Sequence, residues 1–205
     1  MMKRNTLQIL IIVSLIAINV FVLFHVVQLK QEKVTKNYYS NLKNNPDDEL
    51  YSYRLNFTTS IINSNLQLDS VALKDTLNNV IPLKNVFRKG QRQILVCRFS
   101  KTHCASCVNF AIQILQNWTD SIGRENILFL GNHRNNRIFK REIPLYGIRD
   151  MRVFNSYTFN IPVEELGFPY YFILDRNLQI SNVFIPDKAT PNITTNYLEN
   201  VNKKF

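Results

Sequence analysis

Residues 94–118 read ILVCRFSKTHCASCVNFAIQILQNW and contain a C-x-x-C pair, Cys104 and Cys107. The run Ile94–Phe99 has the length and the apolar, β-branched character of a buried strand. After a short polar connector, apolar residues recur at three- and four-residue spacing from Cys107 to Trp118, which is the pattern of one face of an amphipathic helix. The two cysteines are therefore expected where a strand ends and a helix begins.

This position favours thiolate chemistry. The first turn of a helix has unpaired backbone N–H groups and the positive end of the helix dipole, and both stabilise a thiolate relative to a thiol. An exposed thiolate of low pKa can attack the disulfide of another protein, and a second thiol nearby can resolve the mixed disulfide. We predict Cys104 as the nucleophile and Cys107 as the resolving thiol, with positive charge from His103 and Lys101 beside the attacking sulfur.

The order of strand, short connector, C-x-x-C and helix resembles the thioredoxin superfamily, in particular its membrane-anchored, redoxin-like thiol–disulfide interchange proteins. A second block, GFPYYFILDRNLQI at residues 167–180, is similar to the family's G-x-P, apolar strand, aspartate, turn and second strand. The resemblance covers about residues 66 to 203. It implies that Pro169 has a cis peptide bond, which is accessible for proline, and faces the C-x-x-C. Pro169, Phe168 and His103 would then form the substrate groove.

The chain departs from the family's usual motif at two places. The family usually has a tryptophan before the first cysteine, where this chain has His103. The dipeptide between the cysteines usually contains proline or glycine, and here it is Ala105-Ser106. These differences bear on the redox potential and on the choice of partner rather than on the fold.

The N-terminal residues 1–29 predict a membrane anchor. From Leu7 to Leu29 the chain has no aspartate, glutamate, lysine or arginine, and about 20 apolar residues are enough to cross a bilayer. A cleaved signal peptide is the alternative, but it would have a shorter apolar core and a small-x-small cleavage site. Positive charges lie on both sides, so the orientation rests partly on the redox motif. We expect the domain in the periplasm or an equivalent extracytoplasmic space.

The rest of the chain divides into a tether or junction over residues 30–65 and a domain over residues 66–205. The expected fold class is α/β, a thioredoxin-like three-layer sandwich with an N-terminal β-hairpin turning at Asn78-Asn79 and preceded by one transmembrane helix. Further strands are expected at 127–130, 170–174 and 178–184, a short helix near 134–141, and a last helix after Thr190.

Composition limits the other classes of function. The formal net charge is +10, but no basic stripe interleaved with aromatic residues is present, so we expect a solvated basic surface and no nucleic-acid partner. Structural zinc needs four ligands, typically as two close pairs, and the chain has no second C-x-x-C, so no metal is expected. Haem attachment needs C-x-x-C-H, and residue 108 is valine.

Four other residues have two interpretations each. Cys97 is either a small core residue or a third redox thiol or metal ligand. His133 is either within reach of the cysteines, because strand ends share one edge of a sheet, or an ordinary polar residue at the start of a loop. Glu164 and Glu165 are either candidate modulators that exchange protons with the resolving thiol or solvent-facing loop acids.

These observations predict a membrane-anchored thiol–disulfide oxidoreductase that exchanges disulfides with cysteine pairs of extracytoplasmic proteins. The Cys104–Cys107 disulfide would be its redox centre, without a further cofactor, and a membrane-embedded or periplasmic protein would be its electron donor. Two alternatives remain open: a tethered thioredoxin-fold binding module without efficient redox turnover, and a thiol peroxidase.

Overall fold

The computed structural model describes residues 18–19, 21–22, 48–68, 71–157 and 159–205. The described residues from Asp48 onward belong to one compact unit. Most of the expected anchor, residues 7–29, lies outside the described ranges. None of the helices within those ranges is long and apolar enough to cross a membrane.

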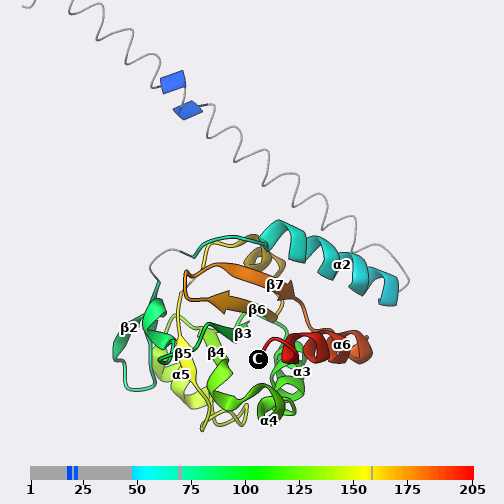
Figure 1. Cartoon of the computed structure of the whole chain (residues 1–205). Helices are drawn as coiled ribbons and strands as arrows, with labels where there is room; N and C mark the ends of the chain where they lie inside the picture. Colours follow the sequence, from blue (N-terminus) through cyan, green and yellow to red (C-terminus); the bar gives the residue numbers. More distant parts are fainter. Residues whose placement is uncertain (1–17, 20, 23–47, 69–70, 158) are drawn as a thin grey trace, which may run out of the picture. The chain divides into compact units, whose positions relative to one another are not determined.

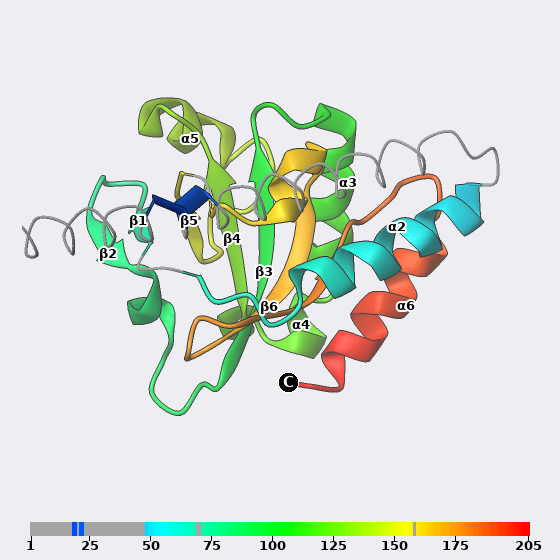
Figure 2. The same cartoon turned by 90° about the horizontal axis from the view of Figure 1, so that it is seen from above.

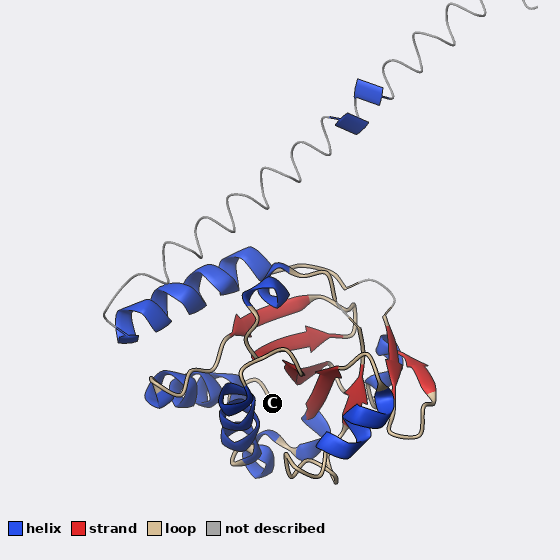
Figure 3. Ribbon diagram, turned by 180° about the vertical axis from the view of Figure 1, so that it is seen from behind, coloured by secondary structure: helices blue, strands red, loops and turns tan. Residues whose placement is uncertain are grey.

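A mixed β-sheet forms the centre of the domain (Figure 1, Figure 3). Among the described residues it has seven strands in the order β2-β1-β5-β4-β3-β6-β7. The central strand β3 pairs in parallel with β4 and antiparallel with β6. The strands are β1 (Ala72–Lys74), β2 (Val80–Pro82), β3 (Gln93–Ser100), β4 (Ile127–Asn132), β5 (Val153–Asn155), β6 (Tyr170–Asp175) and β7 (Ile180–Phe184).

Helices lie on both sides of this sheet, with α3, α4 and α6 on one side and α2 on the other (Figure 1). The helices are α2 (Asp48–Asn63), α3 (Ala105–Gln116), α4 (Thr119–Ile122), α5 (Asn136–Glu142) and α6 (Pro191–Asn202). Short 3-10 turns are η1 (Leu83–Val86), η2 (Arg124–Asn126) and η3 (Pro162–Leu166). The arrangement is consistent with the expected thioredoxin-like sandwich.

Strand β3 is buried on both faces, as its continuous apolar run predicts. Leu95, Cys97 and Phe99 point into the larger core, which α3 and α6 complete. Cys97 is therefore a core residue, and burial raises the pKa of its thiol. Arg98 belongs to the opposite face of the strand, and it is also fully buried.

Helix α3 buries the face that the periodicity predicts. Val108, Ala111 and Leu115 are buried in the core, together with Ile112. The helix ends at Gln116, and the chain then turns into the short helix α4. This packing fixes the axis of α3 against the sheet, so that the first turn of the helix is held at the end of β3.

The N-terminal hairpin is present as expected. Strands β1 and β2 pair antiparallel, with Leu73 opposite Ile81, and β1 joins the sheet at β5. Asn78 turns the chain with a φ of 71°. Asp75 stabilises the turn, because its Oδ1 accepts hydrogen bonds from the backbone N–H groups of Leu77 and Asn79 at 2.7 and 2.9 Å.

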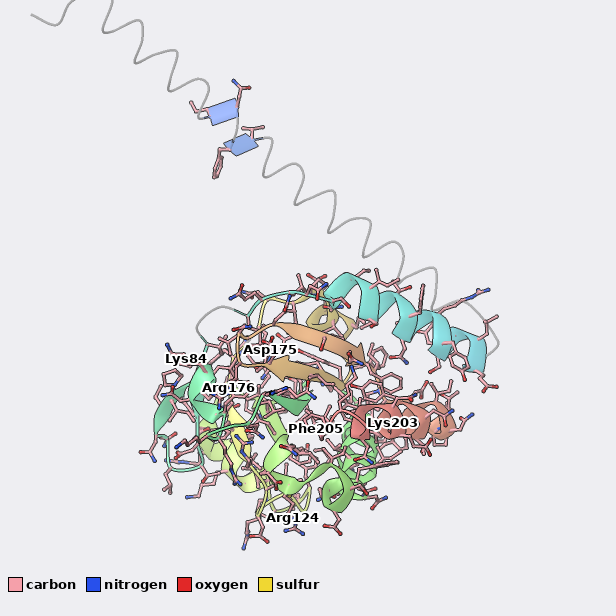
Figure 4. All side chains as sticks on the ribbon, viewed as in Figure 1. Lys84, Arg124, Asp175, Arg176, Lys203 and Phe205 are labelled. Carbon is pink, nitrogen blue, oxygen red and sulfur yellow. The ribbon has the colours of Figure 1, made fainter. Side chains whose placement is uncertain are left out.

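Strands β6 and β7 form the expected antiparallel pair. At their turn, where Figure 4 labels Asp175 and Arg176, Asp175 Oδ1 accepts the N–H of Gln179 at 2.8 Å. The expectation of a cis bond at Pro169 is wrong, since no described peptide bond is cis. Trans is the isomer that X–Pro bonds favour, by about 0.5–1 kcal/mol. The turn η3 ends at Gly167, whose φ is 71°.

Helix α2 lies along β7, the strand at one edge of the sheet. It contacts β7, and its first turn lies beside the start of α6 (Figure 2). There, Asn192 Nδ2 donates a hydrogen bond to Glu49 Oε1 at 3.3 Å. This helix occupies most of the described part of the junction expected over residues 30–65.

Candidate active site

The C-x-x-C pair lies where the sequence predicts, at the end of β3 and the beginning of α3. Cys104 is the N-cap residue of α3, and its carbonyl oxygen accepts the N–H groups of Cys107 and Val108, both at 3.0 Å. The Cys104 thiol is exposed and the Cys107 thiol is partly covered, and both are free thiols. One sulfur is thus open to a partner while the other lies behind it.

The two thiols differ in acidity. Hydrogen bonds from Cys107 and Ser106 to the sulfur lower the pKa of Cys104 to about 7. Burial, and then the neighbouring Cys104 sulfur, raise the pKa of Cys107 to about 11. Near neutral pH, Cys104 is therefore about half thiolate and Cys107 remains a thiol. This is the division that a nucleophile and a resolving thiol require.

A lysine from a distant part of the chain contributes to this acidity. Lys188 Nζ donates a hydrogen bond to Ser106 Oγ at 2.8 Å, and Ser106 Oγ lies 3.2 Å from Cys104 Sγ. An ammonium group has no acceptor, so the Ser106 hydroxyl hydrogen is left to donate to the sulfur. Lys188 also lowers the pKa of Cys104 by its charge.

Sequence reasoning missed Lys188. It lies in the loop between β7 and α6, 82 residues from Ser106, and no local pattern marks it. The sequence points to His103 and Lys101 as the positive charge beside the sulfur instead. Lys101 is an exposed residue of the connector.

His103 does not supply a positive charge. Its Nδ1 accepts the backbone N–H of Ser100 at 3.1 Å, which requires an unprotonated nitrogen. Burial, and then the charge of Arg98, lower the pKa of His103 to about 4. The ring is therefore neutral at pH 7. It is partly buried and belongs to the residue directly before Cys104, so the side chain next to the nucleophile in the sequence carries no charge.

The most unexpected residue near the site is the buried cation Arg98, two residues before the end of β3. Its Nε donates to Glu164 Oε1 at 2.7 Å, and its Nη1 donates to the carbonyl oxygens of Gly131 and Ser156 at 2.9 and 3.1 Å. The guanidinium also lies 4.6 Å from the ring centre of Phe159. A charge can be buried in this way because each donor group has an acceptor.

The same network contains Glu164, for which the sequence left two interpretations open. The carboxylate accepts hydrogen bonds from Arg98, from the Tyr170 hydroxyl at 3.2 Å and from the Phe159 N–H at 3.1 Å. It is therefore not a solvent-facing loop acid, and the hydrogen bonds that it accepts come from Arg98, Tyr170 and Phe159. It joins η3, which leads into the Gly167–Pro169 turn, to the strand that leads into the C-x-x-C. Glu165, its neighbour, is exposed.

Pro169 and Phe168 lie at the edge of the sheet that bears the cysteines. Arg98 pairs with Tyr170 across β3 and β6, so the residues before Tyr170 lie beside the end of β3. Pro169 is buried there and Phe168 is half-buried. Phe168 and Pro169 therefore lie at the same edge of the sheet as the C-x-x-C.

His133 follows β4 and is buried, but it pairs away from the cysteines. Its Nε2 lies 2.7 Å from Glu142 Oε2 in α5, and its ring packs on Phe99 and Phe139 at centroid distances of 6.0 and 5.3 Å. Asn155 hydrogen-bonds to both its N–H and its carbonyl. His133 therefore connects β4, β5 and α5 behind the site.

Among the described residues, no cluster of three or more histidine, cysteine, aspartate or glutamate side chains could hold a metal ion. The redox-capable groups of the site are the two thiols of the C-x-x-C.

Comparison with known proteins finds no matching family model and no matching curated protein. Solved structures do match. A thioredoxin-like protein from Porphyromonas gingivalis is 16% identical, with 69% of this chain and 95% of that chain covered and a TM-score of 0.49. The thioredoxin domain of a thiol-disulfide oxidoreductase from Bacteroides vulgatus is 14% identical (66% and 97% covered, TM-score 0.47). The mitochondrial 2-cys peroxiredoxin from Plasmodium falciparum is 12% identical (68% and 93% covered, TM-score 0.41). Because these identities and TM-scores are low, the matches carry no function over to this chain.

Proposed function

We propose that this protein is a thiol–disulfide oxidoreductase, with Cys104 as the nucleophile and Cys107 as the resolving thiol. The observation that carries the proposal is the pairing of an exposed thiol of lowered pKa with a covered thiol of raised pKa on one helical turn. An inert cysteine in a binding module would have a pKa near its ordinary value of about 8.5.

The exchange has two steps. The Cys104 thiolate attacks one sulfur of a client disulfide, the client S–S bond breaks, and the leaving client thiolate takes up a proton. Cys107 then loses its proton and attacks Cys104 Sγ, which forms the Cys104–Cys107 disulfide and releases the second client thiol. The client gains two electrons and two protons. The enzyme gives up both electrons and the proton of Cys107, and the second proton comes from water, to which Cys104 released its own when it ionised. With a dithiol donor or client the same steps run in reverse.

The second step is helped by the first. Hydrogen bonding and negative charge from the Cys104 sulfur help to raise the pKa of Cys107. Once Cys104 is bonded to a client sulfur it carries no charge, so that contribution disappears and Cys107 becomes easier to deprotonate. The resolving thiol is therefore more acidic after a mixed disulfide has formed than before, although burial, the largest cause of its raised pKa, remains.

Other parts of the chain would bind the client and anchor the domain. Pro169, Phe168 and the neutral His103 would form the groove for an extended client segment. Residues 7–29 would anchor the domain to a membrane, with the domain outside the cytoplasm, where client proteins hold disulfides. A membrane-embedded or periplasmic protein would restore the dithiol.

The test is covalent trapping. Cys107→Ala should accumulate mixed disulfides between Cys104 and client proteins, because no resolving thiol is left, and Cys104→Ala should trap nothing. Cys97→Ala, which changes the buried third cysteine, should still turn over and serves as the control. Turnover by Cys107→Ala without any trapped adduct would contradict the assignment, and peroxide consumption by the wild type would favour the peroxidase alternative.

A further inference from the structure

Helix α2 turns its polar side toward the domain. Asn56 Oδ1 accepts the Ile185 N–H at 2.6 Å, and its Nδ2 donates to the Ile185 carbonyl at 3.2 Å. Asn63 Oδ1 accepts the Val163 N–H at 3.1 Å, and Thr190 Oγ1 donates to Ser52 Oγ at 3.0 Å. The side chains that a surface helix usually presents to water are here buried and used to hold loops.

The opposite side of α2 is apolar and exposed. Leu50, Tyr53, Phe57 and Ile61 are spaced three, four and four residues apart, so they form one stripe along the helix. Their exposed fractions are 40%, 51%, 70% and 59%. We call these four residues the α2 stripe. In the described domain, the other exposed large apolar side chains lie on other elements: Leu77, Val80, Leu145, Tyr157 and Phe205.

A contiguous exposed apolar stripe of this kind marks an interaction surface. Its composition, two aromatic residues and two aliphatic ones beside the exposed cation Arg54, suits the boundary between lipid headgroups and acyl chains. An interfacial helix normally keeps its polar side in water. In α2 the polar side chains are instead buried against the domain, where they form hydrogen bonds with its loops.

The position of α2 in the chain also favours a bilayer. It is the first described element of the domain, and residues 30–47 separate it from the charge-free segment 7–29. A connector of this length reaches at most about 60 Å even when fully extended. The domain from Asp48 onward is basic, with 19 lysines and arginines against 13 aspartates and glutamates, which adds attraction to anionic lipids.

We propose that the α2 stripe lies in the headgroup–acyl boundary of the membrane that holds the N-terminal segment, so that α2 docks the redox domain flat against the lipid. This rests on the membrane anchoring that is part of the proposed function. Because the inner side of α2 holds Ile185 and Thr190, which flank the Lys188 loop, lipid contact would also steady a loop that borders the active site.

The test uses the full chain in vesicles of phosphatidylcholine and phosphatidylglycerol, with and without bromine on the acyl chains. The chain has one tryptophan, so Trp118→Phe provides a background into which Phe57→Trp is introduced. The control is Leu77→Trp, which places the same probe at an exposed apolar position of the β1–β2 turn. Disulfide exchange with a soluble protein substrate shows that each variant is folded.

Bromine should quench roughly half of the emission from Trp at position 57, because an interfacial side chain lies about 5–10 Å into the boundary. The Leu77→Trp emission should not change. Adding Tyr53→Ser and Ile61→Ser to Phe57→Trp should bring its quenching down to the control.

Two outcomes would overturn the proposal, and they are distinguishable. If the chain floats with the vesicles and exchanges disulfides but Phe57→Trp is quenched no more than Leu77→Trp, the stripe does not contact lipid and the docking of α2 is wrong. If the chain does not float with the vesicles, the anchoring fails and the docking of α2 fails with it. The exchange assay reports on the cysteine chemistry in both cases.

Discussion

Lys188 Nζ lies 2.8 Å from Ser106 Oγ, which places an ammonium group one hydroxyl away from the sulfur of Cys104. Ser106 is the second residue of the dipeptide in which this chain departs from the familiar C-x-x-C motif. The departure therefore has a physical role, because serine at this position connects the thiol to a cation from a distant loop.

Lys188→Met should raise the pKa of Cys104 from about 7 toward its ordinary value of about 8.5, because the thiolate loses a nearby positive charge. At pH 7 the rate of alkylation should fall by about twofold or less, in step with the thiolate fraction, because the charge of Lys188 is the smallest of the influences that lower this pKa. Thiolate absorbance as a function of pH measures the shift directly. Lys188→Arg should retain the low pKa, and Lys101→Met should leave it unchanged. An equal rise of the Cys104 pKa in Lys101→Met would mean that the connector also supplies positive charge to the sulfur.

Ser106→Ala should also raise the pKa of Cys104, since it removes one of the hydrogen bonds that stabilise the thiolate. If Ser106 transmits the influence of Lys188, the double variant should show less than the sum of the two single shifts. Asn109→Ala, an exposed change on the same helix, is the control. Strict additivity would mean that Lys188 acts through its charge alone.

The strand β3, the helix α3 and the position of the cysteines could be predicted because their signals are local: an apolar run, a helical period and a three-residue spacing. The Lys188–Ser106 contact could not, because it joins residues 82 positions apart. The Arg98–Glu164 pair spans 66 positions, although an arginine within a buried apolar run does signal a distant partner. Helix α2 could not be predicted either, because its apolar side faces away from the core, contrary to the usual pattern.

Glu164→Ala should destabilise the domain by about 3–5 kcal/mol, because it leaves the Arg98 charge buried without its partner. Glu165→Ala, next to it but exposed, should change the free energy of unfolding by no more than about 0.5 kcal/mol. Denaturant unfolding of both variants measures the difference. Near-equal stability of the two would show that the Arg98–Glu164 pair does not hold η3 to β3.

His103 should make the domain less stable as the pH falls. Its pKa is lowered to about 4 in the folded state, whereas the unfolded chain takes up this proton near pH 6.5. Between these values only the unfolded state is protonated at His103, so its contribution to stability is lost as the pH falls from about 6.5 to about 4. His103→Asn should flatten the stability profile in this window. An unchanged profile would mean that the ring is protonated normally in the fold.

The most direct test of the central claim is the redox equilibrium of the full chain in glutathione buffers of graded ratio. Cys104 and Cys107 should form an intramolecular disulfide in a single two-electron transition, with a midpoint between about −270 and −120 mV, the range of thioredoxin-like pairs. The transition should be absent in Cys107→Ala and present in Cys97→Ala. If no intramolecular disulfide forms at any ratio, the two thiols are not a redox couple and the proposed function is wrong.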